Sequence, residues 1–158
     1  MQLHEYGYTA AMKPDEGQAP RIWIDLLQAG RHLQDEIEHR LKAAGLPPLA
    51  WYDVLIELER GPADGLRPRD LQERLLLAQY NLSRLIDRLV HEELVVRRPC
   101  PEDGRGQLVR ITPGGRRLRQ RMWATYGPAI DELIGQRLPA GLQKVMLQGL
   151  GRLRSSAG

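Results

Sequence analysis

The segment from Tyr80 to His91 concentrates hydrogen-bonding side chains on one side of an expected helix. With 100° between successive residues, its leucines, isoleucine and valine fall together on the other side. The polar side carries Tyr80, Arg84, Asp87, Arg88 and His91, with Asn81 and Ser83 at its margins. Such a set of donors and acceptors suits the edges of nucleic-acid bases. The alternative for an isolated helix is an ordinary solvated face.

A second candidate contact is the loop Pro99–Gly106, which contains two prolines and two glycines between strand-like segments. An arginine near such a tip, Arg105, suits a narrow minor groove, where the negative potential is enhanced. Asp103 stands two residues earlier, and we expect its carboxylate to hold the Arg105 guanidinium. An ordinary polar hairpin tip is the alternative here.

Positive charge is clustered rather than spread along the chain. The net charge is only +3, yet Arg67–Arg121 holds 13 Arg, no Lys and 7 acidic residues. A basic centre between acidic arms indicates a polyanion site. Four arginines, Arg116, Arg117, Arg119 and Arg121, crowd the start of an expected helix, the unfavourable end for cations. Nearby phosphate would explain them, and a solvated surface is the alternative.

Other classes of function find little support in the sequence. We find no nucleophile elbow, phosphate-binding loop or metal-ligand motif, so an enzyme is not expected. His32 and His39 lie seven residues apart without a Cys/His cluster, so no metal site or cofactor is expected. Apolar runs are too short for a membrane span, and the N-terminus lacks a secretory signal pattern. One cysteine, Cys100, cannot form an internal disulfide, which fits a reducing, cytoplasmic location.

These residues need particular elements to position them. Apolar spacing and the Pro and Gly positions predict helices over about 20–44, 48–60, 68–76, 79–92 and 113–138, with a last helix from Pro139. Alternation and β-branching predict strands at Leu94–Arg98 and Gln107–Thr112, with a further short strand at Leu66 and Arg67. The expected fold is mainly α with a small β-wing, a winged helix-turn-helix.

The sequence divides into an N-terminal arm, a dimerisation region in two parts and a central lobe. Residues 1–19 show no sustained period and form an expected flexible arm. Residues 20–47 and 122–158 carry apolar faces larger than a small core satisfies, so we assign them to dimerisation. Residues 48–121 form the expected DNA-binding lobe, with the wing at about 95–112.

In this order, the motifs resemble the MarR family of bacterial winged-helix transcription regulators. The likeness rests on Asn81-Leu82-Ser83-Arg84-Leu85-Ile86-Asp87-Arg88-Leu89, on Glu102-Asp103-Gly104-Arg105, and on Ile111-Thr112-Pro113-Gly114-Gly115. These resemble the family's recognition helix, its Asp-x-Arg wing signature and its strand-to-helix junction. The match is specific over about 67–121 and mainly architectural over 20–60 and 122–154.

The resemblance implies a homodimeric repressor on a pseudo-palindromic duplex. It puts Tyr80, Asn81, Ser83 and Arg84 at bases or adjacent phosphates, Arg88 at the backbone or in a salt bridge, and Asp103 and Arg105 in the wing contact. It also implies release by a small aromatic acid or phenol. Candidate ligand contacts are Trp23, His39, Trp51, Tyr52 and Trp123, with Arg21 or Arg31 for a carboxylate. Packing in the core and hinge is the alternative for these aromatic residues.

Two positions depart from the family pattern. Ala78 stands where Ser or Thr usually caps the recognition helix, and its loss should cost about 1 kcal/mol. Glu93 stands where glycine is usual, and because a left-handed Glu is strained, we expect a different path there. Two alternative functions stay open: a redox-responsive regulator acting through Cys100, and a winged-helix protein-interaction module that does not bind DNA.

Overall fold

The structure, a computed structural model, describes residues 17–76 and 81–155. The chain divides into two units, Met1–Glu36 and Ile37–Gly158. The described part of the first unit is the N-terminal portion of α1 (Gln18–Ala43), whose last turns belong to the second unit. In the described residues no helix is long and apolar enough to cross a bilayer.

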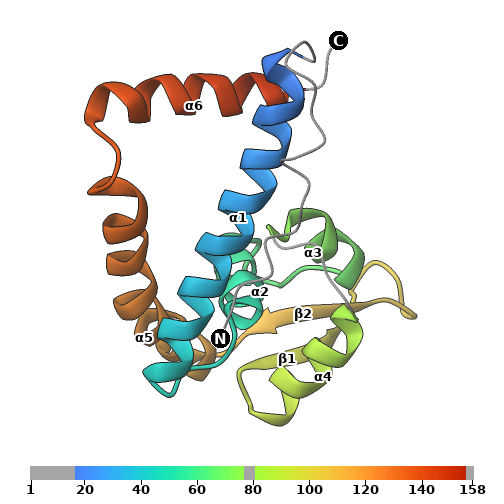
Figure 1. The fold of residues 1–158 in the computed structure, drawn as a ribbon. Helices are drawn as coiled ribbons and strands as arrows, with labels where there is room; N and C mark the ends of the chain where they lie inside the picture. Colours follow the sequence, from blue (N-terminus) through green and yellow to red (C-terminus); the bar gives the residue numbers. More distant parts are fainter. Residues whose placement is uncertain (1–16, 77–80, 156–158) are drawn as a thin grey trace. The chain divides into compact units, whose positions relative to one another are not determined.

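The second unit follows the predicted order of elements (Figure 1). After α1 come α2 (Leu49–Arg60), α3 (Pro68–Arg74), α4 (Leu82–His91), β1 (Val95–Pro99), β2 (Gln107–Ile111), α5 (Pro113–Ile130), the π-helical turn η1 (Asp131–Gly135) and α6 (Ala140–Arg154). The mainly α fold with a small wing is therefore confirmed. Helix α4 begins at Leu82, later than the expected start near residue 79.

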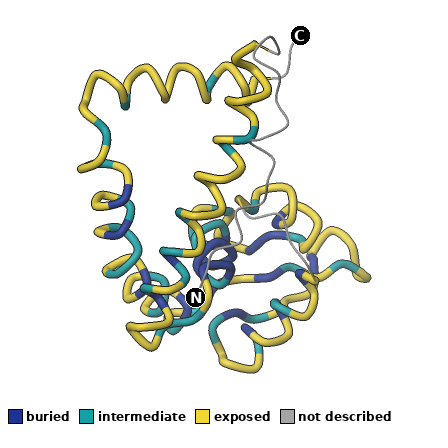
Figure 2. The backbone as a smooth tube through the Cα atoms, viewed as in Figure 1, coloured by how far each residue is buried: buried dark blue, intermediate teal, exposed yellow. Residues whose placement is uncertain are grey.

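The core of this unit lies where α2, α3 and α4 meet the two strands. Its buried residues are Val54, Leu55, Leu58, Leu66, Leu71, Leu82, Ile86, Leu89, Val95, Val109 and Ile111. Figure 2 shows buried residues concentrated in α2 and the strands, whereas α6 has no buried residue. A fully buried Leu or Val contributes about 1.5–3 kcal/mol, so this cluster fixes the orientation of α4.

The wing is a two-stranded antiparallel sheet with Val95 opposite Ile111 and Pro99 opposite Gln107. The short strand expected at Leu66 and Arg67 is reduced to a single bridge between Leu66 and Val109. The two residues exchange backbone hydrogen bonds of 2.9 and 2.8 Å. The bridge ties the segment before α3 to the base of the wing.

Helix α4 ends in a Schellman motif, and Glu93 occupies its left-handed position with φ of 57°. The amide of Leu94 donates to the Leu89 carbonyl and the amide of Glu93 donates to the Val90 carbonyl. The different path expected for a non-glycine residue is therefore wrong. The two capping hydrogen bonds and the packing of Leu94 on the core outweigh the strain at Glu93.

Replacing Glu93 by glycine should stabilise the fold. The left-handed strain of about 1–2 kcal/mol disappears, and the greater freedom of glycine in the unfolded chain offsets part of it. We expect a net gain of about 0.5–1 kcal/mol, measured by urea unfolding. Glu92→Gly is the matched control. Glu92 has an ordinary φ of −82°, so its replacement relieves no strain and glycine there should lower the stability. Equal effects of both changes would contradict the strain argument.

A tight junction joins the end of α4 to the start of α5. The Thr112 hydroxyl donates to the carbonyls of Glu93 (2.7 Å) and Leu94 (3.0 Å) and accepts from the Gly115 amide (3.0 Å). Thr112 thus caps α5, as predicted, and its hydroxyl also hydrogen-bonds two residues just beyond the end of α4. A Cβ on Gly115 would collide with the Leu94 carbonyl oxygen, which explains the glycine in this motif.

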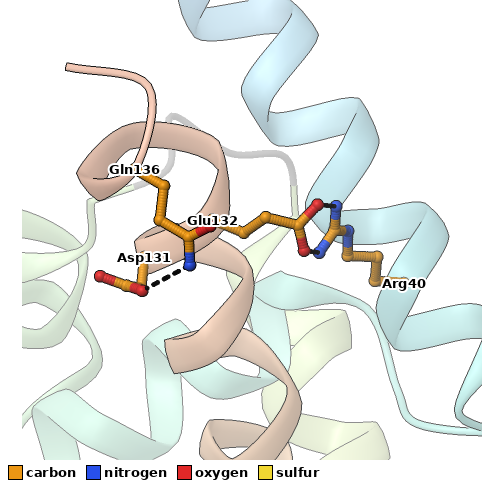
Figure 3. A network of polar contacts seen from close by, with 4 residues as sticks. All are labelled: Arg40, Asp131, Glu132 and Gln136. Carbon is orange, nitrogen blue, oxygen red and sulfur yellow. Dashed lines mark hydrogen bonds and ion pairs between the residues drawn. The ribbon is translucent and has the colours of Figure 1, made fainter.

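An ion pair links the last turns of α1 to η1 (Figure 3). The Arg40 guanidinium contacts both carboxylate oxygens of Glu132, at 2.6 and 2.9 Å. The hydrogen bond from Arg40 lowers the pKa of Glu132 below its ordinary value. Nearby, the Gln136 side chain donates to Asp131 at 3.0 Å. These contacts hold the point from which the chain turns into α6.

Candidate nucleic-acid interface

The first turn of α4 is capped by Asn81. Its side-chain oxygen accepts a hydrogen bond of 3.2 Å from the Arg84 amide. Because Ala78 cannot cap a helix, the sequence predicted an uncapped start, but Asn81 supplies the cap three residues later. Ala78 itself lies outside the described residues. With its oxygen engaged in this way, Asn81 keeps its amide nitrogen for a partner.

The outward face of α4 carries the predicted polar residues. Ser83, Arg84 and Arg88 are exposed, while Leu82, Ile86 and Leu89 are buried. The predicted partition of the helix is therefore confirmed. Arg84 and Arg88 line a cavity of about 360 Å³ together with Trp51 of α2. Tyr80, also predicted on this face, lies outside the described residues.

The wing loop is ordered by Asp103, but not through the contact expected from the sequence. The Asp103 carboxylate accepts from the backbone amide of Arg105 at 3.1 Å. Further hydrogen bonds join the Cys100 amide to the Gly106 carbonyl and the Gly106 amide to the Asp103 carbonyl. Within the described part of the chain, the exposed Arg105 guanidinium has no ion-pair partner, so Asp103 fixes the turn and leaves the cation available.

The arginines at the start of α5 divide into two groups. Arg116 Nη1 lies 3.3 Å and Arg119 Nε lies 2.6 Å from the carboxylate of Glu59 on α2. The Arg119 contact is an ion pair without hydrogen-bond geometry. Phosphate proximity is thus not needed to explain these two residues. Arg117 and Arg121 are exposed and stay candidates for phosphate contacts.

One interaction at this surface was missed from the sequence. Arg97 of β1 pairs with Asp87 of α4, with 2.6 Å between Arg97 Nη2 and Asp87 Oδ1. Alternation along β1 puts Arg97 on the same face as the buried Val95. The two-residue spacing from Val95 could have predicted the pair, because the face of β1 that packs on the core also lies toward α4.

Cys100 is buried at the base of the wing, with 5% of its surface exposed. A guanidinium nitrogen of Arg67 lies 3.4 Å from its sulfur. Burial shields the sulfur from oxidants in solution.

A small cavity lies between α2 and α5, with a volume of about 250 Å³. Two predicted ligand contacts, Tyr52 and Trp123, line it, and their rings stack with centroids 6.0 Å apart. Tyr126, which was not predicted, packs edge-on against both rings. Burial, with smaller effects from Tyr52 and Asp53, raises the pKa of Tyr126 above its ordinary value.

The other predicted ligand residues are not in this cavity. Trp51 lines the separate cavity beside α4, and His39 lines neither of the two. Trp23 belongs to the first unit, as do Arg21 and Arg31. Of these two arginines, Arg21 lies 3.7 Å from Asp25. The five predicted aromatic and histidine contacts are thus not gathered within the second unit.

Asp53 connects the small cavity to the helix-turn-helix. It lines the cavity and is 8% exposed. Its carboxylate accepts a hydrogen bond of 3.2 Å from the Leu76 amide, just beyond α3. Arg74 and Leu76 line the same cavity. A ligand there would contact Arg74, the last residue of α3, and Leu76 just beyond it.

Comparison with known sequences agrees with this geometry. Residues 44–106 match the model of the MarR family. The chain is 27% identical over 115 residues to the HTH-type transcriptional regulator MhqR of Bacillus subtilis, covering 72% of this chain and 77% of that protein. It is 29% identical over 125 residues to the multiple antibiotic resistance protein MarR of Escherichia coli, covering 75% and 85% respectively.

Comparison with solved structures supports the same fold. The chain is similar to Sco3205, a MarR family transcriptional regulator from Streptomyces coelicolor solved in complex with DNA. The two are 25% identical with a TM-score of 0.75, over 85% of this chain and 84% of that one. The similarity extends well beyond the 63 residues matched by the family model.

Proposed function

We propose that this chain, which belongs to the MarR family of winged helix-turn-helix transcription regulators, is a homodimeric repressor that binds a pseudo-palindromic DNA duplex. The observation that carries the proposal is the joint exposure of the α4 face and the Arg105 guanidinium on one lobe. Helix α4 enters the major groove, where Arg84 and Ser83 meet base edges. Arg105 enters the adjacent minor groove.

Two substitutions test the roles of Arg84 and Arg105. Against an operator selected from random duplexes, Arg84→Ala should lose about 1–3 kcal/mol and discriminate less between sequences. Arg105→Ala should weaken binding to every sequence and reduce the salt slope by about 0.9. Fluorescence anisotropy at several KCl concentrations measures both effects.

The matched control for these variants is Arg137→Ala, an exposed arginine between η1 and α6 that should leave binding unchanged. Wild-type protein without a salt-sensitive, sequence-dependent complex would refute the proposed function. It would instead favour a winged helix that serves only protein contacts. An unchanged sequence preference in Arg84→Ala would remove only its base-reading role.

The homodimer is supported by apolar surface that the single chain leaves uncovered. Helix α6 exposes Leu142, Val145, Met146, Leu147, Leu150 and Leu153. Helix α1 likewise exposes Ile22, Trp23 and Leu27. Large apolar side chains left exposed along a helix are characteristic of an interface. Dimerisation would cover them and set the spacing between two recognition helices.

The cavity between α2 and α5 is the proposed effector site. Tyr52, Trp123 and Tyr126 offer aromatic faces, and Tyr126 offers a phenolic donor. Arg74 offers positive charge, whereas Arg60 lies 3.8 Å from Glu57, which lines the same cavity. A volume of about 250 Å³ suits a single-ring aromatic acid or phenol. The Asp53–Leu76 hydrogen bond joins this site to the end of α3, the first helix of the helix-turn-helix.

Calorimetric titration with a panel of benzoates and phenols tests this site. We expect at least one compound to bind, and Tyr126→Phe to weaken its binding by about tenfold through loss of one hydrogen bond. Gln120→Ala, an exposed change on α5, should have no effect. Silence across the panel would reject the cavity as an effector site.

The redox alternative gains no support from the buried position of Cys100. If oxidation of the thiol regulates binding, treatment with hydrogen peroxide should abolish the DNA complex. We expect unchanged DNA binding after such treatment.

A further inference from the structure

The DNA-facing surface of α4 contains one acidic residue between Leu82 and His91, Asp87. It stands three residues after Arg84 and one before Arg88, on the exposed side of the helix. A carboxylate there would repel the phosphates that the neighbouring arginines attract. Its partner Arg97, 2.6 Å away on β1, balances that charge.

The strand pattern explains why Arg97 and not its neighbour forms this pair. Val95 and Arg97 lie on one face of β1, and Val95 is fully buried. Arg97 therefore extends past the edge of the core toward α4, and its side chain is 34% exposed. Arg98 points from the other face, and among the described residues it has no ion-pair partner. Of these two adjacent arginines, Arg97 is therefore paired with a carboxylate, and Arg98 is not paired with any described residue.

We propose that Asp87 is a specificity-determining residue that keeps Arg97 from binding phosphate. Sequence-independent affinity grows with the number of phosphates that the protein neutralises. By engaging Arg97, Asp87 removes one cation from that number and leaves a larger share of the affinity to base contacts. This inference rests on the proposed DNA-binding function and adds to it a limit on non-specific binding.

The test compares full-length variants on a random-sequence duplex and on the selected operator over a range of KCl concentrations. Asp87→Asn should steepen the salt slope by about 0.9, because Arg97 becomes free to contact a phosphate. At 0.1 M KCl this slope corresponds to roughly eightfold tighter non-specific binding. Operator binding should gain less because the geometry of the base contacts is unchanged, so the specificity ratio falls.

Two controls separate release of Arg97 from a general change of charge. Glu92→Gln removes an exposed acid next to α4 without freeing Arg97, so its slope should match the wild type. The double variant Asp87→Asn, Arg97→Gln should return to the wild-type slope. Thermal melting confirms that each variant is folded, since an exposed pair adds little stability.

The outcomes are distinct. A steeper slope in Asp87→Asn alone supports the inference. Equal slopes in Asp87→Asn and Glu92→Gln, or a gain that persists in the double variant, overturns it. In those cases wild-type binding still stands, so only this inference fails. A wild type that binds no DNA fails the proposed function and this inference with it.

Discussion

Gly115→Ala should destabilise the protein by about 3 kcal/mol, the cost of forcing extra atoms into a packed junction. The new methyl group would meet the Leu94 carbonyl oxygen and the Ile111 side chain, and neither can move freely. Leu94 follows the left-handed Glu93, and Ile111 is buried in the wing. The clash therefore displaces α5 from the end of α4. Urea unfolding measures the loss.

The neighbouring glycine provides the control. A methyl group on Gly114 would find its nearest atom 3.5 Å away, an ordinary contact. Gly114→Ala should therefore be neutral or gain up to about 1 kcal/mol, since alanine is the better helix former. DNA binding should weaken in Gly115→Ala at temperatures where Gly114→Ala still binds. Equal stability of the two variants would show that the junction can relax.

This junction marks what the sequence could predict. Thr112-Pro113 predicted a helix start because Thr caps a helix and Pro suits its first turn, and Thr112 does cap α5. The α4 face was also predictable, because helical geometry alone separates Leu82, Ile86 and Leu89 from the polar residues. Local rules are sufficient where the contacts are near in sequence.

Contacts between distant residues were beyond such rules. Glu59 pairs with Arg116 and Arg119 from a helix more than 50 residues away in sequence. That pairing turns two expected phosphate contacts into structural ion pairs. Asp103 illustrates a finer limit. The expected contact of its carboxylate with the Arg105 guanidinium was wrong, because the carboxylate accepts a hydrogen bond from the Arg105 backbone amide instead. Asx turns of this kind compete with side-chain pairing over the same two residues.

The ligand residues show the same limit. Trp51 and Tyr52 are adjacent, yet successive residues on a helix point about 100° apart. They line different cavities for that reason. Tyr126 reaches Tyr52 from α5 over 74 positions of sequence, and only the packing of α2 on α5 brings their rings within 5.1 Å.

Met146→Glu should break the proposed dimer and with it most of the DNA affinity. On a helical wheel Met146 lies with Leu142, Leu150 and Leu153 on one face of α6. A carboxylate buried there without a partner costs several kcal/mol, so we expect self-association to weaken by about 100-fold or more. A monomer presents one recognition helix and loses the gain from linked half-sites, roughly 100-fold.

Leu147→Glu is the matched control, because Leu147 lies about 105° from the centre of that face and is 71% exposed. It should remain a dimer and bind the operator as the wild type does. Sedimentation velocity gives the oligomeric state, and anisotropy gives the affinity for one and two half-sites. A dimeric Met146→Glu would move the interface away from this face. A monomeric Met146→Glu that binds a full operator as tightly as the wild type would instead remove dimerisation from the mechanism, because two linked helices would then add nothing to recognition.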